Sequence, residues 1–400
     1  MQQQILHYLD DNERQQFQLL EKLVLQPSHT LYKEGVNQVG LLLRQVLADC
    51  PLQCTVHQSQ VCGDNLIFHS AAVTTRAQRP LVLVGHMDTV FPLESSFNFY
   101  REDETHAYGP GVCDMKGGLV TAVFLLKALN SQRLLEKIPI VLICNSDEET
   151  GSRHSAELIR SYGRKGLCGL VFECGGTEGE VVTGRKGKSG YHLDIYGKSG
   201  HAAFTQELGK TSAVLELAHK TIHLEELNDP DKEIVVNVGL VAGGSAANVV
   251  AERATAEIDT RYVTSEDGEI CRKRVEEIAS RSTVKGTTST ISATHNRVPM
   301  KQTEQNRALY RLFKQQADFL GLPLRSELRS GVSDANTLSE CGIPVLDGLG
   351  PIGGLDHSAD EYMIKASLVQ RCKLATLTVI DIWEKQRHGL LPHFANTQGD

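Results

Sequence analysis

The apolar run at 81–84 (Leu-Val-Leu-Val), closed by a proline and a glycine, constrains the fold more than any other segment. If this run forms a strand, neither of its two faces carries a polar residue, which is typical of a strand buried on both faces of a largely parallel sheet. Similar runs occur at 138–144 and 170–172, and a helical pattern at 117–129 precedes them. Strands that alternate with helices predict an α/β layer fold with a mostly parallel sheet.

The sequence changes character near Gly184. Polar and apolar residues alternate at 191–196 and 254–262, as in antiparallel strands with one exposed face. Two further β-like segments and helical patterns at 212–227 and 266–280 complete an α+β insert. Since 400 residues exceed one ordinary core, we expect two domains. The predicted boundaries are a discontinuous first domain, 1–184 and 297–400, and an inserted domain, 185–296.

Composition limits the partners and the compartment. The formal charge is −8, with 41 basic and 49 acidic residues, and no basic stripe occurs. We therefore do not expect the protein to bind nucleic acid. The polar N-terminus does not resemble a signal peptide, and no apolar run is long enough for a bilayer. We therefore expect a cytoplasmic protein without membrane contact. Ten cysteines without a CxxC pair indicate reduced thiols.

Acids and histidines follow the predicted strands at the points where strands end, which is where α/β proteins place their chemistry. The residues are His86 and Asp88 after 81–84, Asp114 in the glycine-lined turn 109–118, Glu148 and Glu149 after 138–144, Glu173 after 170–172, and His357 in a glycine-containing turn.

Two imidazoles with several carboxylates are the ligands that two neighbouring divalent ions require, and mixed nitrogen and oxygen donors favour zinc. We predict that Asp114 bridges the ions, with His86 and Glu173 on one ion. Glu149 and His357 would hold the other. Cobalt or manganese could occupy the same ligands.

The remaining two acids then have separate predicted roles. Glu148 would be the general base that activates a water shared by the two ions and later gives the proton to a leaving nitrogen. Asp88 would accept the imidazole N–H of His86 and fix its tautomer.

Each of these residues has a simpler explanation when taken singly. Asp114 could cap a helix, the pair Glu148-Glu149 could be a solvated turn, and an isolated histidine is usually a hydrogen-bonded turn residue. Cys113 beside Asp114 could be a nucleophile, a hypothesis that ranks below the metal site. The joint occurrence at strand ends favours the metal site.

Four motifs resemble one superfamily: GHMDTV (85–90), GPGVCDMKGG (109–118), DEETGS (147–152) and GKSGHA (197–202). The superfamily includes glutamate carboxypeptidase, acetylornithine deacetylase and succinyl-diaminopimelate desuccinylase, and the likeness covers nearly the whole chain in order. Glu173, rather than an aspartate, is most similar to the glutamate carboxypeptidase and deacetylase branches.

The resemblance implies a three-layer catalytic domain with two zinc ions per subunit and an inserted lid or dimerisation domain of a homodimer. It implies the same five ligands, the same base and a cis peptide bond after Asp114. It also implies that His201 reaches the partner's active site and stabilises the oxyanion. Asn248 and Arg261 match positions that bind the substrate's carboxylate.

The last two residues also have simpler explanations, namely a turn residue for Asn248 and a strand-face salt bridge for Arg261. Glutamate carboxypeptidases supply further basic residues near the substrate. At those positions this sequence has Glu180, which is acidic, and Arg297, which lies slightly out of the expected register. These departures leave the choice of glutamate open.

The predicted function is a metal-dependent hydrolase that cleaves an amide or peptide bond adjacent to a carboxylate-bearing amino acid, in a small molecule or short peptide. An N-acyl-amino-acid deacylase such as acetylornithine deacetylase is the alternative, and a non-catalytic peptide-binding dimer is a remote one. A nicotinamide or flavin enzyme is excluded because no GxGxxG follows the first strand.

Overall fold

The computed structural model describes residues 1–75, 78–205, 210–391 and 394. The described residues form two compact units. The first comprises Met1–Gly184, Gln302–Arg329 and Ser333 onward, and the second comprises Arg185–Lys301 with Ser330–Val332. Among the described helices, none combines the length and apolarity that crossing a membrane requires.

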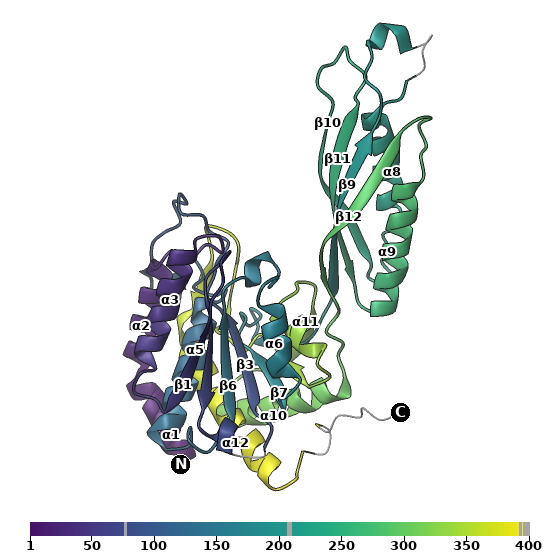
Figure 1. Cartoon of the computed structure of the whole chain (residues 1–400). Helices are drawn as coiled ribbons and strands as arrows, with labels where there is room; N and C mark the ends of the chain where they lie inside the picture. The colour runs from purple at the N-terminus through teal and green to yellow at the C-terminus, as the bar shows by residue number, and fades with distance from the viewer. Residues whose placement is uncertain (76–77, 206–209, 392–393, 395–400) are drawn as a thin grey trace. The chain divides into compact units, whose positions relative to one another are not determined.

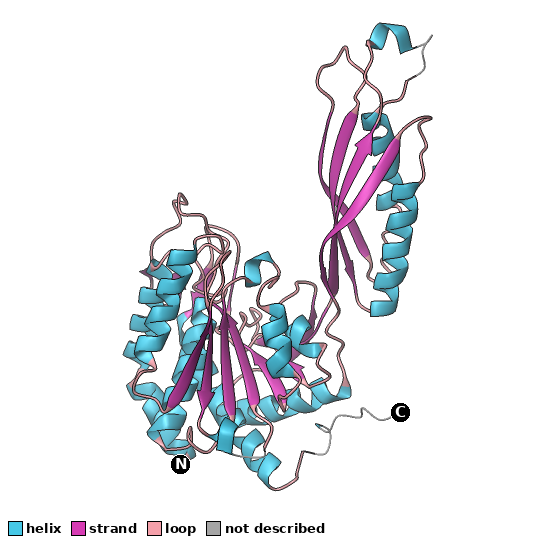
Figure 2. Ribbon diagram, in the orientation of Figure 1, coloured by secondary structure: helices cyan, strands magenta, loops and turns pink. Residues whose placement is uncertain are grey.

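The first unit contains a six-stranded sheet in the order β1-β2-β6-β3-β7-β14 (Figures 1 and 2). The four strands from β6 to β14 run parallel, and β1 and β2 add an antiparallel edge. The predicted α/β class with a mostly parallel sheet is therefore confirmed. The strands are β1 (Leu52–His57), β2 (Asn65–Ser70), β3 (Leu81–His86), β6 (Ile140–Asn145), β7 (Cys168–Val171) and β14 (Val345–Leu346).

Helices cover both faces of this sheet, which gives three layers (Figure 1). Along β3 the side chains alternate between the faces. At Gly85 a Cβ would meet Leu119 of α5, whereas Val82 faces the other way and lies against Gly166. The helices of the unit are α1 (Gln2–Asp11), α2 (Glu13–Leu25), α3 (Lys33–Val46), α4 (Ala72–Thr75), α5 (Lys116–Ser131), α6 (Ala156–Gly163), α10 (Glu304–Leu320), α11 (Asp334–Ser339) and α12 (Lys365–Arg387).

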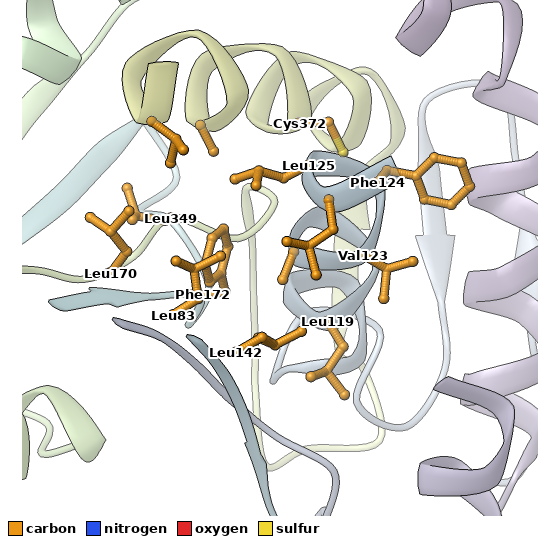
Figure 3. Packing of buried hydrophobic residues seen from close by; sticks show 14 of the residues in the cluster. Leu83, Leu119, Val123, Phe124, Leu125, Leu142, Leu170, Phe172, Leu349 and Cys372 are labelled. Carbon is orange, nitrogen blue, oxygen red and sulfur yellow. The ribbon is translucent and has the colours of Figure 1, made fainter. Parts of the chain in front are cut away.

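The main core lies between the sheet and α5 with α12 (Figure 3). Leu83, Leu142 and Leu170 come from three adjacent strands and face Leu119 and Val123 of α5, all nearly inaccessible to solvent. Because β3 is buried along its whole length, its apolar sequence is required on both faces. This core fixes the sheet against α5, and thereby fixes the turn that precedes α5.

Two small sheets of the first unit are absent from the sequence prediction. One joins β8 (Glu180–Arg185) to β13 (Arg325–Arg329), and the other has the order β15-β16-β5-β4. The strands of the second sheet are only two or three residues long, too short for a hydrophobic period to appear. They are β4 (Arg101–Glu102), β5 (His106–Tyr108), β15 (Gly353–Gly354) and β16 (Tyr362–Ile364).

The second unit is an antiparallel sheet, in the order β10-β11-β9-β12, with two helices packed on it. Its elements are β9 (Gly187–Tyr196), α8 (Ala213–Glu225), β10 (Val235–Gly243), β11 (Arg253–Tyr262), α9 (Ser265–Ser280) and β12 (Thr288–Arg297). Ser212 and Thr264 cap the two helices through their side-chain oxygens. The α+β character predicted for the insert is confirmed, whereas its role as a lid or dimerisation domain stays a prediction.

Candidate metal centre

Parallel strand ends bring the predicted acids and histidines of the first unit together. His86 ends β3, Glu173 follows β7, and Glu148 begins the 3-10 turn η1 (Glu148–Thr150) just after β6. Since these three strands run parallel, their carboxyl ends lie at the same edge of the sheet. The cluster is thus a direct consequence of the strand order.

Asp114 lies between the two histidines. Its Oδ1 is 3.1 Å from Nε2 of His86, and its Oδ2 is 3.2 Å from Nε2 of His357. The same His357 nitrogen lies 3.1 Å from Oε2 of Glu149. One carboxylate therefore presents a separate oxygen to each imidazole, which is the arrangement a bridging ligand needs. The peptide bond between Asp114 and Met115 is cis, as the resemblance implies.

Glu173 and Glu148 complete the cluster on the side of His86. Oε1 of Glu173 is 3.6 Å from Nε2 of His86. Two groups of side chains each bring their donor atoms within 4.8 Å of one another. One group is His86, Asp114 and Glu149, and the other is His86, Glu148 and Glu173. Glu148 is therefore as close to the cluster as the predicted ligands, so proximity alone does not separate a base from a ligand.

The electrostatics of the cluster show an excess of buried negative charge. Burial, followed by repulsion from Asp114, raises the pKa of Glu149 to about 8 and raises that of Glu173 well above its usual range. Burial also opposes ionisation of Asp114, but hydrogen bonds with His357 and His86 outweigh it and hold the pKa of Asp114 below its usual range.

The histidines show the complementary shift. Hydrogen bonds to Asp114 and Glu149 raise the pKa of His357 to about 11. Burial opposes charging of His86, but Glu173 and its other acidic neighbours outweigh it and raise the pKa of His86. The cluster therefore attracts positive charge strongly.

A divalent cation fits this donor set. Four carboxylates and two imidazoles can all be deprotonated at such close range only when a cation compensates their negative charge. Imidazole nitrogen and carboxylate oxygen are the donors that zinc and similar divalent ions accept. The residues present thus fit a metal centre held by His86, Asp114, Glu149, Glu173 and His357.

Asp88 connects the two sides of the cluster. It is fully buried, and its carboxylate accepts hydrogen bonds from the Thr30 hydroxyl at 2.7 Å and from the backbone N–H groups of Glu148 and Glu149 at 3.2 Å each. The Nδ1 of His86 lies closer to the backbone carbonyl of Asp88, at 3.0 Å, than to its carboxylate, at 3.4 Å. Asp88 therefore orients His86 through its main chain and holds η1 through its side chain.

Glu361 is a residue that the sequence analysis missed. It is fully buried and accepts three backbone N–H groups, from Gly111 at 2.9 Å, Cys113 at 2.8 Å and Asp114 at 2.9 Å. These bonds tie the turn that carries Asp114 to a segment 247 residues away. The only sequence signal was the position of Glu361 shortly after His357.

The nucleophile hypothesis for Cys113 is not supported. The thiol is fully buried and points to the carbonyl oxygen of Pro351 at 3.8 Å. A hydrogen bond with Cys174, together with burial, raises the pKa of Cys113 well above its usual range. A nucleophilic cysteine needs the opposite shift, toward the thiolate.

The other predicted site residues belong to the second unit. His201 is exposed, and its Nδ1 accepts the backbone N–H of Ala203 at 3.1 Å. The segments of His201 and Asn248 are adjacent, because the carbonyl of Asn248 accepts the N–H of Ala202 at 3.0 Å. Arg261 on β11 donates to Asp259 at 2.7 Å and to the carbonyl of Ser330 at 3.2 Å.

The structure also shows where Arg297 and Glu180 lie, the two residues that depart from the glutamate carboxypeptidase pattern. Arg297 is buried at the end of β12. Glu180, at the start of β8, accepts the backbone N–H of Glu178 at 2.9 Å.

A mostly parallel sheet with an acid–histidine cluster at its strand ends is an architecture that suits a metal-dependent hydrolase. Residues 82–381 match the model of Peptidase family M20/M25/M40. The chain therefore belongs to this family of metal-dependent hydrolases.

Individual relatives agree with this assignment. Carboxypeptidase G2 of Pseudomonas sp. (strain RS-16) is 28% identical over 373 residues, which cover 91% of this chain and 88% of the relative. Acetylornithine deacetylase of Shigella sonnei (strain Ss046) is 27% identical over 271 residues, covering 62% and 68% of the two chains. Among solved structures, aminopeptidase PepT of Bacillus cereus ATCC 10987 superposes with a TM-score of 0.77 at 21% identity, covering 93% of this chain and 99% of that chain. The superfamily resemblance seen in the sequence is confirmed.

Proposed function

We propose that this hydrolase releases a carboxylate-bearing amino acid by cleaving the amide or peptide bond beside it, in the manner of a glutamate carboxypeptidase. The observation that carries the proposal is the Asp114 carboxylate between two imidazoles, with Glu148 next to the same cluster. The similarity to carboxypeptidase G2 along nearly the whole chain supports this branch of the family.

His86, Asp114, Glu149, Glu173 and His357 would hold two zinc ions, which would supply Lewis acidity for the attacking water and the scissile carbonyl. Glu148 is the general base in this proposal: its carboxylate takes a proton from the attacking water and returns it to the leaving nitrogen. Asp88 keeps Glu148 in place through its hydrogen bond to the Glu148 backbone.

The substrate's carboxylate would bind to Arg261 of one copy and to the partner's Asn248 in the dimer proposed below, because Asn248 lies beside His201 and far along β11 from Arg261. The Arg261 guanidinium is half-buried and already ordered by Asp259, so little side-chain entropy is lost when a second carboxylate binds. Asn248 is exposed and can offer its amide.

We expect Arg261→Ala to raise the Michaelis constant for substrates with a free carboxylate by about 10–100-fold, the loss of a charge-assisted hydrogen bond. Substrates whose carboxylate is replaced by an amide should be affected little. Arg253→Ala, which removes an exposed arginine of the same strand, is the matched control. An equal rise for acids and amides would show that Arg261 is structural only.

A homodimer would explain why His201 and Arg261 can act on the same substrate. Within one copy they lie toward opposite ends of β11: the segment of His201 neighbours Val250, before the strand begins, and Arg261 is near its end. From Arg253 to Arg261 the strand rises about 26 Å. A small substrate cannot span that distance, so the partner's His201 would have to supply the oxyanion contact, and the partner's Asn248 would lie beside it.

The β10 edge is our proposed dimer contact. In the described part of the second unit, β10 pairs only with β11, and its Leu240 and Val241 are 69% and 60% exposed. Val214 and Ile222 of the neighbouring α8 are also exposed. A free apolar edge of this kind pairs with another chain, and two identical edges give a symmetric contact.

We expect Leu240→Lys to weaken this dimer at least roughly 10-fold, since a charge on the edge must be desolvated for pairing. Light scattering after size exclusion, at a protein concentration between the two dimer dissociation constants, should then give the chain mass of 43.9 kDa for the variant and about twice that value for the wild type. Val56→Lys, on the free edge strand of the first unit, is the matched control. A wild-type protein of single-chain mass would refute the dimer.

The proposed function is tested by hydrolysis of a substrate panel with zinc-loaded and chelator-treated protein. The panel contains an N-acyl glutamate, N-acetylornithine, N-succinyl-diaminopimelate and several dipeptides. Zinc-dependent release of glutamate is the expected result. Activity only on N-acetylornithine would select the deacylase alternative, which the similarity to acetylornithine deacetylase supports. Activity that survives complete metal removal would refute the proposed metal dependence.

A further inference from the structure

The turn η1, which carries the proposed base and one of the proposed ligands, has no apolar side chain of its own. Its residues are Glu148, Glu149 and Thr150, and none of the three is fully buried. A Cβ placed on Gly151, which ends the turn, would meet nothing within 4 Å. Since no hydrophobic packing holds η1, its position depends on hydrogen bonds at its two ends.

Two different carboxylates hold the two ends of η1. The beginning is held by Asp88, which accepts two backbone N–H groups of the turn. At the end, the backbone N–H of Ser152 closes the turn on the carbonyl of Asp147 at 2.8 Å, and the Ser152 hydroxyl donates to Oδ1 of Asp334. Ser152 is fully buried and has a φ of 53°, which a residue other than glycine adopts only when its surroundings hold it there.

Asp334 is itself fixed by elements of the first unit. It is the first residue of α11 and is buried, and Ser333 before it caps the helix and donates to Asp347 at 2.6 Å. The second oxygen of Asp334, Oδ2, accepts the side-chain N–H of Asn145 at 2.8 Å. Asn145 is the last residue of β6 and pairs in register with His86 of β3. Asp334 therefore connects the end of η1 to the sheet edge that carries the metal centre.

We propose that Asp334 is a positioning residue, which holds η1 through Ser152 so that Glu148 and Glu149 face the metal centre. This inference rests on the proposed function, which gives those two acids their roles as base and ligand. A carboxylate suits the task because its two oxygens accept one bond each, one from the end of the turn and one from the end of the strand. The rival account is that the two bonds only stabilise the fold.

Ser152→Ala removes the hydroxyl that Asp334 holds and keeps the rest of the turn. In the metal-free protein, hydrogen–deuterium exchange of the peptide 146–151 should become about 10–100-fold faster, the effect of losing one buried hydrogen bond to a carboxylate. In the metal-loaded protein, kcat should fall about 10–100-fold, because a small displacement of the base is costly. Metal affinity, measured by competition with a chelator, should fall by a similar factor of about 10–100, because Glu149 moves with the turn.

Ser70→Ala is the matched control, because it also removes a buried serine hydroxyl of the first unit. This hydroxyl donates to the carbonyl of Ile138 at 2.7 Å and accepts the N–H of Ile140 at 2.9 Å, at the beginning of β6 and not at its end. The control should lower Tm but leave the exchange of 146–151, kcat and metal affinity unchanged. If Ser152→Ala also lowered Tm and nothing else, the rival account would hold and the positioning role would be refuted.

Asp334→Asn tests whether Asp334 acts through Ser152. The amide presents an N–H to one of the two donors, so the same three effects are expected. Combining it with Ser152→Ala should cost no more than about 2-fold beyond the worse single variant, since the two residues share one bond. Fully additive losses would overturn the proposed route.

The exchange measurement separates this inference from the proposed function, because it needs neither metal nor substrate. A wild-type protein that hydrolyses nothing in the panel would refute the proposed function. Unchanged exchange of 146–151 in Ser152→Ala would refute the positioning role, whatever the wild type hydrolyses. If Asp334→Asn does not fold, the exchange of Ser152→Ala decides.

Discussion

Glu148→Gln should lower kcat by about 10²–10⁴-fold, the usual contribution of general acid–base catalysis, while the bound metal stays unchanged. Glutamine keeps the size and polarity of the side chain but removes the basic oxygen that takes the proton. The backbone hydrogen bond from Glu148 to Asp88 is unaffected, so η1 should keep its position. The measurements are steady-state hydrolysis of the best substrate and metal content by elemental analysis.

Metal content decides between the two roles that geometry allows for Glu148. Its carboxylate lies within ligand distance of His86 and Glu173, so a ligand role would be equally compatible with its position. Glu149→Gln is the matched control, because it makes the same change one residue away in a predicted ligand. We expect that control to lose metal together with activity. Glu148→Gln that loses metal in proportion to turnover would make Glu148 a ligand, and near-normal turnover would remove it as the base.

Much of the candidate site could be predicted because the relevant signal is local. Each buried strand is a continuous apolar run, and the polar residue that follows it necessarily lies at the sheet's edge. His86, Glu149 and Glu173 were placed in this way, and the structure brings them together with Asp114 and His357. Parallel strand order converts a pattern in sequence into a cluster in space.

The remaining features depend on pairings between distant segments. The strands β15 and β16 are too short to have a hydrophobic period. They pair with each other, and the pairing of β16 with β5 joins segments some 250 residues apart. The support that Thr30 gives to Asp88 likewise links residues 58 positions apart. Glu361 is the clearest case, because nothing in its surrounding sequence indicates that its partners are backbone N–H groups near Asp114. Whether the residues of the second unit bind substrate stays a prediction.

Glu361→Ala should destabilise the first unit by about 3 kcal/mol or more, because three backbone N–H groups, two of them buried, would lose their carboxyl acceptor at about 1–3 kcal/mol each. The same change should weaken metal binding by about 10–100-fold, the usual effect of removing a residue that holds a ligand in place. Thermal unfolding and competition with a chelator measure the two effects.

Two further variants distinguish this anchoring role from a general loss of packing. Glu361→Gln keeps one acceptor oxygen but presents an amide N–H to one of the donors, so we expect a smaller loss of stability than with alanine. Asp360→Ala removes an exposed acid next to it and should change neither measurement appreciably. If Glu361→Ala lost stability but kept full metal affinity, the turn that carries Asp114 would be held by other contacts, such as the packing of Met115 and Leu119 against Gly85, and Glu361 would be a stabilising residue without influence on the metal centre.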